Sequence, residues 1–508
     1  MYSPTTPPPA LRVPPALWLA ITLVAVGYMG FLFQSGASYA GGSDSSGYLN
    51  SARLLAHGQV SENVRAIPGL SPPVWDNYNY QSLGYNVDAG TGRMVPSYPI
   101  GFPLHLAGAA AIVGFEKTAR LVNALNALAA GFLLYALGRE LGLARHWALA
   151  GVAVLWACPV WIFQSLQPMS DAVATTWGLG AILGAWRARE RPVWALASGA
   201  AFAIAVLVRP TSIVLIAPLL VVLGGSWRAW SAFALGGLPF ALGLGVYNHA
   251  VYGSAIESGY NHGGHNIFDA FEWHFLRGNL LHFAAWIPRL LSPPIALLAL
   301  LGLPWVFRRM PRTGFLLVAW LAAFVALYAC YFCAGETWWY LRFLLPAFPA
   351  VILAGLLALQ MWVERPAGKR SWPVPTLLLA VCLAFQLNLA HQLHVTSVRD
   401  EERNYWLAGK WVREHVPANA ILLTWQCSGS MLYYNPQPIV RWDLFQMNDF
   451  ERLRRTAAQL HRPIYAPVFP FEEAEFHDRN RAAWQAVAHP GTVTIWYLDP
   501  ARETEATR

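Results

Sequence analysis

The sequence predicts a polytopic α-helical membrane protein of about 11 transmembrane helices, with external juxtamembrane helices and a small C-terminal α/β domain. Of its 508 residues, 56% are hydrophobic and only 12% are charged, whereas soluble domains average about 25% charged. Several apolar windows of about 18–20 residues match the thickness of the hydrocarbon layer. The last part of the chain differs, because short apolar strand patterns alternate there with helical patterns. These observations exclude a soluble globular protein.

The charge balance points to membrane topology rather than to nucleic-acid binding. The net charge of +8 comes mostly from arginines in short loops between apolar stretches, a pattern that orients membrane proteins. The chain has no P-loop, Rossmann or HExxH motif, so no motif for an ATP-driven pump or a zinc protease is present. Usage rich in Ala, Leu, Trp and Arg with little Lys is typical of a GC-rich bacterium.

The N-terminus predicts a disordered cytoplasmic segment followed by a first span. Residues 1–15 are Pro-rich, which disfavours regular structure. The apolar stretch 16–34 is either a cleaved signal peptide or an uncleaved helix. We favour the helix, because the stretch is longer than a usual signal core and many spans follow it.

Apolar windows then predict the remaining spans. The eleven predicted spans are 16–34, 118–137, 146–164, 170–186, 193–208, 211–225, 230–249, 290–307, 314–334, 341–362 and 373–393. A further apolar piece, 101–115, is short and interrupted near its start by Pro99 and Pro103. Counting it as a span would move Arg139 and Arg145 to the arginine-poor side, so we expect a re-entrant or interfacial helix.

Arginines divide the loops into two sets. One set of loops carries Arg139 and Arg145, Arg187 to Arg191, Arg228, Arg308 to Arg312, and Arg365 to Arg370. The opposite short loops carry only Arg209 and Arg342. Because positive residues mark the cytoplasmic side, the N-terminus is expected inside and the C-terminus outside a plasma (inner) membrane.

This topology predicts three parts. After residues 1–15 comes a transmembrane domain, 16–395, with external loops 35–117 and 250–289. Residues 396–508 form an extracytoplasmic α/β domain, with strands expected near 420–424, 438–440, 463–468 and 493–498 and helices near 404–415, 447–460 and 471–487. About 110 residues suffice for a core of its own.

Two acidic residues stand at the predicted outer face. Asp44 follows the first span, and Asp171 opens the span that follows Ser170. Charges at a membrane boundary are costly and often functional, so Asp44 is a candidate general base. The alternative for both is helix capping, with Ser170 or Asp171 bonding the first turn of the span. If both carboxylates face one external cavity, acid/base or cation-binding chemistry becomes more plausible.

Three arginines are candidates for binding a donor phosphate. Arg342 and Arg209 lie where arginines are otherwise scarce, and a guanidinium fork suits phosphate oxygens. The alternative is snorkelling beside the interfacial Trp and Tyr residues, and Glu336 could instead neutralise Arg342. Arg93 lies in a turn-like stretch of the first loop, where it is either an ordinary hairpin charge or a donor contact.

His262 and His265 are close in sequence, but their spacing is loose and no adjoining Cys or carboxylate completes a metal site. We therefore expect no protein metal site at these two residues.

Several motifs, in order, resemble the GT-C superfamily of membrane glycosyltransferases, especially its protein O-mannosyltransferases and aminoarabinose transferases. The segment Ser43-Asp44-Ser45-Ser46-Gly47-Tyr48, continuing to Ala52, resembles their Asp-x-x-x-Tyr-x-x-x-Ala entry. The resemblance continues in Tyr98-Pro99-Ile100-Gly101-Phe102-Pro103, Gly114-Phe115-Glu116-Lys117, Ser170-Asp171, Val208-Arg209-Pro210-Thr211 and Arg342-Phe343-Leu344-Leu345-Pro346. It covers most of residues 20–360.

The resemblance implies a hexosyl- or pentosyltransferase that uses a polyprenyl-phosphate-linked sugar donor at the outer membrane face, usually with inversion. The acceptor would be a lipid, glycan or protein of the cell envelope. Asp44 takes the place of the catalytic base, and Tyr48 supports it. Many members carry two adjacent acids where this chain has Asp44-Ser45, so Asp171 is the best match for a second acid. The resemblance leaves a divalent metal ion open as a cofactor.

Two other classes remain as alternatives. A transporter or flippase of lipid-linked sugars would need polar groups deep within its spans, often in paired broken helices. In a non-catalytic membrane scaffold, Asp44 and Arg342 would be ordinary interface residues.

Overall fold

The computed structural model describes residues 15–71, 75–264, 266–364 and 373–499. The predicted disordered segment up to residue 14, the basic residues of 365–370 and His265 lie outside the described residues.

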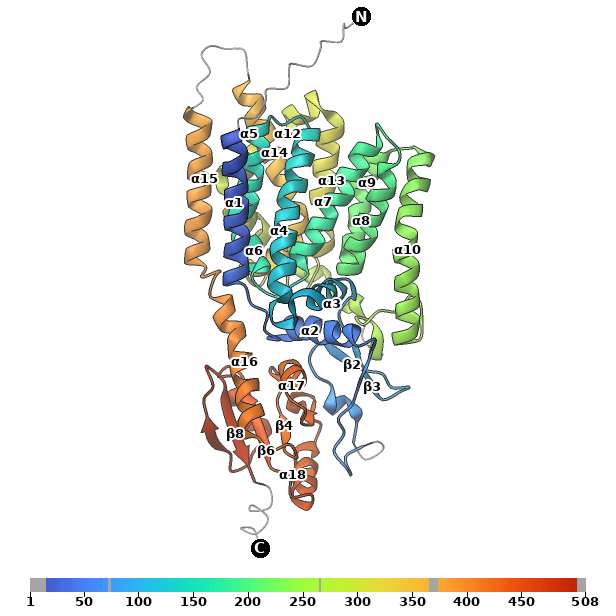
Figure 1. Cartoon of the computed structure of the whole chain (residues 1–508), viewed down its shortest axis with the longest axis vertical. Coiled ribbons are helices and arrows are strands. Elements are labelled where there is room, and N and C mark those ends of the chain that lie inside the picture. Colours follow the sequence, from blue (N-terminus) through green and yellow to red (C-terminus); the bar gives the residue numbers. More distant parts are fainter. Residues whose placement is uncertain (1–14, 72–74, 265, 365–372, 500–508) are drawn as a thin grey trace, which may run out of the picture.

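A helical bundle forms one end of the molecule, and a unit of strands and helices forms the other (Figure 1). The bundle contains α1 (Pro15–Ser35), α4 (Phe115–Glu140), α5 (Arg145–Ala157), α6 (Pro159–Ser165), α7 (Asp171–Ala188), α8 (Trp194–Val208), η2 (Pro210–Leu215), α9 (Ile216–Leu223), α10 (Trp227–Tyr252), α11 (Leu276–Leu291), α12 (Pro293–Arg309), α13 (Pro311–Tyr328), η6 (Trp338–Ala347), α14 (Phe348–Val363) and α15 (Pro373–Gln392).

Among the described residues, six helices are long and apolar enough to cross a membrane, or up to eight if each bent helix pair is one span. The predicted count of about 11 is not confirmed. α8 has 15 residues and α9 has 8, whereas a span needs about 20. The 18-residue α7 carries Asp171 at its start and Arg187 near its end, which lowers its mean hydropathy. The chain is nevertheless a membrane protein by its several long apolar helices.

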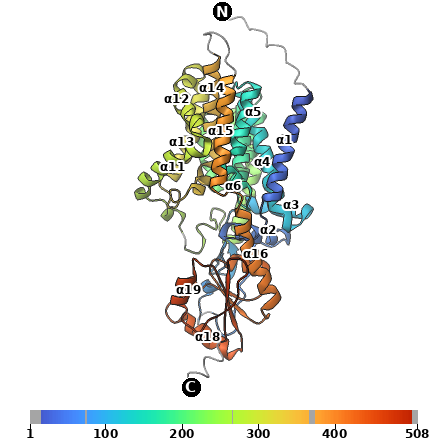
Figure 2. The ribbon, with the colours of Figure 1, turned by 90° about the vertical axis from the view of Figure 1, so that its left-hand side faces the viewer.

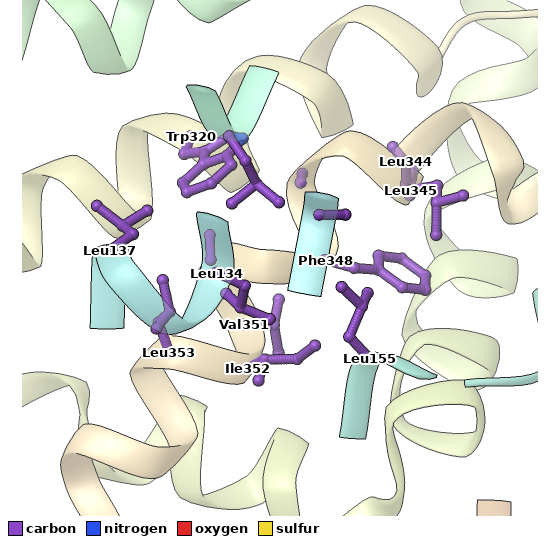
Figure 3. Packing of buried hydrophobic residues seen from close by; sticks show 14 of the residues in the cluster. Leu134, Leu137, Leu155, Trp320, Leu344, Leu345, Phe348, Val351, Ile352 and Leu353 are labelled. Carbon is purple, nitrogen blue, oxygen red and sulfur yellow. The ribbon is translucent and has the colours of Figure 1, made fainter. Parts of the chain in front are cut away.

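Helix α14 forms the centre of the bundle. It is apolar on all sides, and 94% of the best window in the Trp338–Val363 segment is buried, as expected for a helix surrounded by others. Figure 3 shows Phe348, Val351, Ile352 and Leu353 of α14 among side chains of α4, α5, α13 and η6. The indole N–H of Trp320 donates to the Pro346 carbonyl over 2.9 Å, which fixes η6 against α13.

The long first loop folds against the end of the bundle. Figure 1 shows α2 (Ser43–Ala56) and α3 (Gly101–Val113) lying across that end. With 13 residues, α3 is too short to span, in agreement with its predicted non-crossing role. A three-stranded antiparallel sheet of order β1-β3-β2 completes the loop, and its strands are β1 (Glu62–Asn63), β2 (Tyr85–Val87) and β3 (Arg93–Pro96).

Short 3-10 turns connect these parts. They are η1 (Asn77–Tyr80) in the first loop and η3 (His262–Gly264), η4 (Ile267–Ala270) and η5 (Trp273–Phe275) in the loop between α10 and α11.

The C-terminal unit is a mixed five-stranded sheet of order β5-β4-β6-β8-β7 with helices around it (Figure 2). β4 is parallel to β5 and β6, and β8 is antiparallel to β6 and β7. Its elements are α16 (Val398–His415), β4 (Ile421–Leu423), α17 (Ser428–Tyr434), β5 (Ile439–Val440), η7 (Trp442–Leu444), α18 (Asp449–Gln459), β6 (Ile464–Val468), α19 (Glu473–Arg479), β7 (Gln485–Ala488) and β8 (Thr494–Leu498).

Most of the expected strands and helices of this unit are present, but the predicted helix 471–487 is wrong in its second half. α19 ends at Arg479, and residues 485–488 pair with β8 as the edge strand β7. Tertiary pairing therefore overrides the local helical pattern of this stretch.

The first loop and the C-terminal unit share a hydrophobic core. Leu54, Tyr85 and Met94 from the first loop pack with Tyr405 and Val412 of α16 in one cluster of buried side chains. The Asn50 side-chain amide donates to the Gly429 carbonyl over 2.9 Å. Residues far apart in sequence are thus held together where the bundle ends.

The arginine-rich loops meet at the opposite end. α4 starts beside α3 and runs 26 residues, or about 39 Å. Its last residue, Glu140, forms a 2.8 Å ion pair with Arg187 at the end of α7. Arg189 and Arg312 line one cavity of about 420 Å³ at this end. This grouping agrees with the predicted division of charges, and which side each end faces stays a prediction.

Candidate functional site

A cavity of about 570 Å³ lies where the bundle meets the C-terminal unit. Four segments form it: the start of α2, the region from α6 to the start of α7, η6, and the link from α15 into α16. A volume of this size is typical of small-molecule sites. Its polar lining includes Asp44, Gln164, Gln167, Arg342 and Glu402, and its aromatic lining is Phe163, Trp338, Trp339 and Tyr340.

Asp44 faces this cavity and pairs with Arg342. The Arg342 Nη1 atom lies 2.8 Å from the Asp44 Oδ2 atom. The N-cap of α2 is Gly42, and no side chain caps the helix, so the capping alternative for Asp44 is wrong. The side chain of Asp44 is 26% exposed and that of Arg342 is 15% exposed. The pair is therefore open to a ligand that enters the cavity.

The surroundings of Asp44 keep it ionised. Burial opposes the charge of Asp44, but the Arg342 guanidinium and the Tyr98 hydroxyl outweigh burial, so the pKa of Asp44 lies below its usual range. The Tyr98 hydroxyl is also 2.7 Å from the Ser43 hydroxyl. At neutral pH, Asp44 is thus a carboxylate that accepts hydrogen bonds but has a low affinity for protons.

Asp171 forms a second acid–arginine pair, which is closed. Its carboxylate is bound by Arg209, and the side chain of Asp171 is 1% exposed. The Ser170 N-cap of α7 makes no capping hydrogen bond through its side chain, so the capping alternative is wrong here too. Asp171 is not among the residues that line the cavity. A cavity shared by the two carboxylates and a chemical role for Asp171 both stay predictions.

The two pairs are neighbours across Phe343. The guanidinium carbons of Arg209 and Arg342 lie 5.1 and 5.2 Å from the centroid of this ring. Both arginines are largely buried and paired with acids, so simple snorkelling toward water does not describe them. The Nε atom of Arg342 is buried and lacks a hydrogen-bond partner. This donor is left unsatisfied by the described residues.

Tyr48 links the helix that carries Asp44 to the residue that precedes Asp171. It lies one helical turn after Asp44 on α2, and its hydroxyl is 3.0 Å from the Ser170 hydroxyl. The ring packs at 5.0 Å from Tyr98 and edge-on at 5.0 Å from Phe102. Burial raises the pKa of Tyr48, so its hydroxyl stays neutral and fixes α2 against the start of α7.

The remaining predicted site residues lie elsewhere. Arg93 is exposed at the start of β3, where its Nη2 atom donates to the Ser61 carbonyl over 3.1 Å. Glu336 is exposed, and the ion pair of Arg342 is with Asp44 rather than with Glu336. Neither Arg93 nor Glu336 lines the cavity.

Protein ligands for a metal ion are too few at this site. Within the described ranges, no group of three His, Cys, Asp or Glu side chains could hold a metal. The cavity offers carboxylates, but no such group of three is found among its described residues. His262 has carboxylate neighbours that the sequence did not indicate, Glu257 at 2.8 Å and Asp88 at 3.2 Å. The Glu257 carboxylate lies at Nδ1 of His262, within hydrogen-bond distance, and the Asp88 carboxylate lies near Nε2.

Glu402, like its neighbour Glu401, is a cavity residue that sequence reasoning did not assign to the site. It lies in the first part of α16 and reaches the start of α2 beside Asp44. The signal was an acidic pair, Glu401-Glu402, that directly follows the last apolar stretch on the predicted side of Asp44. Asp44 and Glu402 are 358 positions apart in the sequence, so no local pattern indicates that they lie close together.

One protein-family model matches part of this chain. Residues 97–245 match the family model described as dolichyl-phosphate-mannose-protein mannosyltransferase. Among curated proteins, none matches the chain.

Solved structures share the fold over nearly the whole chain. ArnT from Cupriavidus metallidurans bound to undecaprenyl phosphate is 14% identical, with a TM-score of 0.57 over 96% of this chain and 98% of that one. The oligosaccharyltransferase of Archaeoglobus fulgidus is 12% identical, with a TM-score of 0.52 over 92% of this chain and 71% of that one. The arabinofuranosyltransferase AftD from Mycobacteria is 14% identical, with a TM-score of 0.51 over 88% of this chain and 39% of that one.

At these identities the likeness concerns the fold. The resemblance to the GT-C superfamily is confirmed by the family match and by these structural neighbours together.

Proposed function

We propose that this chain, which has the GT-C fold, is a membrane glycosyltransferase that moves a sugar from a polyprenyl-phosphate donor to a cell-envelope acceptor. The transfer would occur at the outer face of the membrane, with inversion at the sugar carbon. The observation that carries the proposal is the Asp44–Arg342 pair, which lines an aromatic cavity at the end of the bundle.

Arg342 is suited to the phosphate of the donor. Its buried Nε atom has no partner, and a guanidinium beside an aromatic wall binds phosphate oxygens through charge-assisted hydrogen bonds. Solved neighbours were determined with undecaprenyl phosphate and with dolichol phosphate bound. By analogy, the phosphate would lie at Arg342 and the lipid chain would run along the apolar surface of the bundle.

Asp44 is suited to the acceptor. As a carboxylate in the first turn of α2, it can accept a hydrogen bond from the acceptor hydroxyl or amine and orient it toward the sugar. The acceptor atom attacks the anomeric carbon while the bond from that carbon to the phosphate oxygen breaks. The transition state is oxocarbenium-like, and Arg342 stabilises the charge that develops on the leaving phosphate.

The activating group arrives on the lipid, so the reaction needs no nucleotide site. This agrees with a sequence that has no nucleotide-binding motif. A transporter of lipid-linked sugars would instead place polar groups deep inside its spans, whereas here two acid–arginine pairs lie at one end of the bundle.

The test is transfer by the purified full-length protein in liposomes. The donor is a radiolabelled sugar on a polyprenyl phosphate, and the acceptors are envelope lipid, glycan and protein fractions. We expect label to move to one fraction in a protein-dependent manner. Movement of intact donor across the bilayer without transfer would instead support a flippase. Mass spectrometry of envelope glycans and glycoproteins with and without the protein then identifies the acceptor.

A further inference from the structure

The cavity holds two carboxylates besides Asp44, Glu401 and Glu402, and the first-loop motif supplies neither. Glu401 accepts a hydrogen bond from the Ser397 hydroxyl over 2.8 Å. Glu402 of α16 lines the same cavity as Asp44, and the negative charge of Asp44 acts on it. Asp171, the second acid expected from the sequence, is instead closed off by Arg209. The acidic residue Glu402 beside Asp44 is therefore contributed by the C-terminal unit.

The start of α2 is shaped to admit this carboxyl group. A Cβ atom on Gly41 would lie 1.9 Å from Oε2 and 2.6 Å from Oε1 of Glu402, so any side chain at position 41 would collide with it. The Ser45 hydroxyl and the Gly42 amide also face the carboxyl group. The Oε2 atom is buried and has no hydrogen-bond partner. An unsatisfied buried oxygen of this kind is costly unless it is protonated or used by a ligand.

The groups packed around Glu402 favour its protonated form. Burial raises the pKa of Glu402 to about 7, the Ser45 hydroxyl and the Gly42 amide oppose this in part, and the charges of Glu401 and Asp44 add to it. The phenols of Tyr405 and Tyr434, whose pKa values are raised by burial, also lie near Glu402. His394 lines the same cavity from the link between α15 and α16.

Arg342, the cation that lines the cavity, has its ion pair with Asp44. It therefore keeps Asp44 charged and does not pair with Glu402.

We propose that Glu402 is the second carboxylate of this site and ends the reaction holding the proton that the acceptor releases. The inference rests on the proposed transferase function. The acceptor O–H or N–H bond breaks, and a bond forms between the acceptor atom and the anomeric carbon. The bond from that carbon to the phosphate oxygen breaks, and its electron pair leaves with the polyprenyl phosphate at Arg342. Asp44 orients the acceptor, and the proton comes to rest on Glu402.

The different roles of Asp44 and Glu402 follow from their different environments. Two carboxyl groups whose surroundings push their proton affinities apart take different roles in acid/base catalysis. The Asp44 carboxylate, stabilised by Arg342, is a good hydrogen-bond acceptor but a poor final base. Glu402 has a proton affinity near the operating pH, which is optimal for a general base.

The test compares Glu402→Gln with Glu402→Asp in the reconstituted full-length protein. Wild-type kcat should rise with pH through a midpoint near 7, because Glu402 must be deprotonated to accept the proton. Glu402→Gln should lower kcat by about 10²- to 10⁴-fold and remove this limb of the profile, with little change in the KM for donor. Glu402→Asp should keep the pH-dependent limb with a reduced kcat.

Glu414→Gln, an exposed site on the same helix, is the matched control and should leave the pH profile of kcat unchanged.

Folding of the variants is checked by thermal unfolding. Because the pKa of Glu402 is raised in the folded protein, protonated Glu402 contributes to the free energy of unfolding of the wild type. This contribution is lost as pH rises through about 7. Glu402→Gln should therefore be at least as stable as the wild type at pH 8. Infrared difference spectra should show a protonated carboxyl group that disappears between pH 6 and 8 in the wild type and is missing in Glu402→Gln.

Two failures are distinguishable. A wild-type protein that transfers no sugar from any polyprenyl phosphate overturns the proposed function and this inference with it. An active wild type whose pH profile is the same in Glu402→Gln overturns the inference alone and leaves the proposed function standing.

Discussion

The two acid–arginine pairs at this end of the bundle are made of the same residue types but lie in different surroundings. The Asp44–Arg342 pair borders a cavity and keeps part of each side chain accessible. The Asp171–Arg209 pair has an acid that is only 1% exposed. A ligand can insert between the first two charges and replace one as a partner. In the second pair the Asp171 carboxylate has no such access, whereas Arg209 is 14% exposed, about as much as Arg342. The second pair therefore holds α7 against the end of α8. Chemistry is expected at the first pair and stability at the second.

The largest effect should come from breaking the open pair at its acid. Asp44→Asn removes the charge that orients the acceptor but keeps the shape of the side chain, so we expect kcat to fall by about 10²- to 10⁴-fold. Sugar transfer in liposomes measures this. Expression should stay close to wild type, and the melting temperature should fall less than in Asp171→Asn, since Asp44 is 26% exposed against 1% for Asp171 and caps no helix. Normal turnover in this variant would remove Asp44 from the mechanism.

Removing the charge of Asp171 should instead lower the stability of the folded protein. Asp171→Asn leaves the Arg209 charge buried without its partner, which costs about 3–5 kcal/mol. Thermal unfolding in detergent should show a large fall in melting temperature. The double variant Asp171→Asn, Arg209→Met removes both charges and should recover much of the stability, because an apolar replacement of a buried ion pair is often neutral. A stable but inactive Asp171→Asn would contradict this and return Asp171 to the chemistry.

Local sequence patterns identified the four charged residues of these two pairs. They did not identify which acid contacts which arginine. Asp44, Asp171, Arg209 and Arg342 each stand out as a charge beside an apolar stretch, which is visible within a short window of sequence. Arg342 pairs with a residue 298 positions away, and no local pattern encodes such a contact. Each acid pairs with a different arginine, and a cavity shared by Asp44 and Asp171 stays a prediction.

The same limit applies to the fold. Apolar length identified the long helices of the bundle, but the count of eleven spans assumed that each apolar window is one crossing. Broken segments such as α5 and α6, bent by 64° at Pro159, show that an apolar window does not specify its path. Glu402 was missed because it is contributed by the C-terminal unit, whose position against α2 depends on a core shared with the first loop.

A smaller effect should distinguish charge from geometry at Arg342. Arg342→Ala removes a charge-assisted hydrogen bond to phosphate, worth about 1.5–3 kcal/mol, so the donor KM should rise by about 10- to 150-fold. Arg342→Lys keeps the charge but loses the planar fork, and its KM should rise less. Steady-state kinetics with varied donor provides the comparison. Equal effects of the two variants would mean that Arg342 acts through packing against Phe343.

The smallest effect should come from the arginine that the structure places outside both pairs. Arg93 is exposed on β3, bonds the Ser61 carbonyl and does not line the cavity. Arg93→Ala should therefore change the donor KM by less than about twofold, since exposed substitutions usually cost under 0.5 kcal/mol. Measured beside Arg342→Ala with the same donor, it tests whether phosphate binding depends on position at the cavity or only on positive charge in the first loop. A large rise in KM for Arg93→Ala would mean that the donor reaches the β1-β3-β2 sheet, and the site would then extend well beyond the open pair.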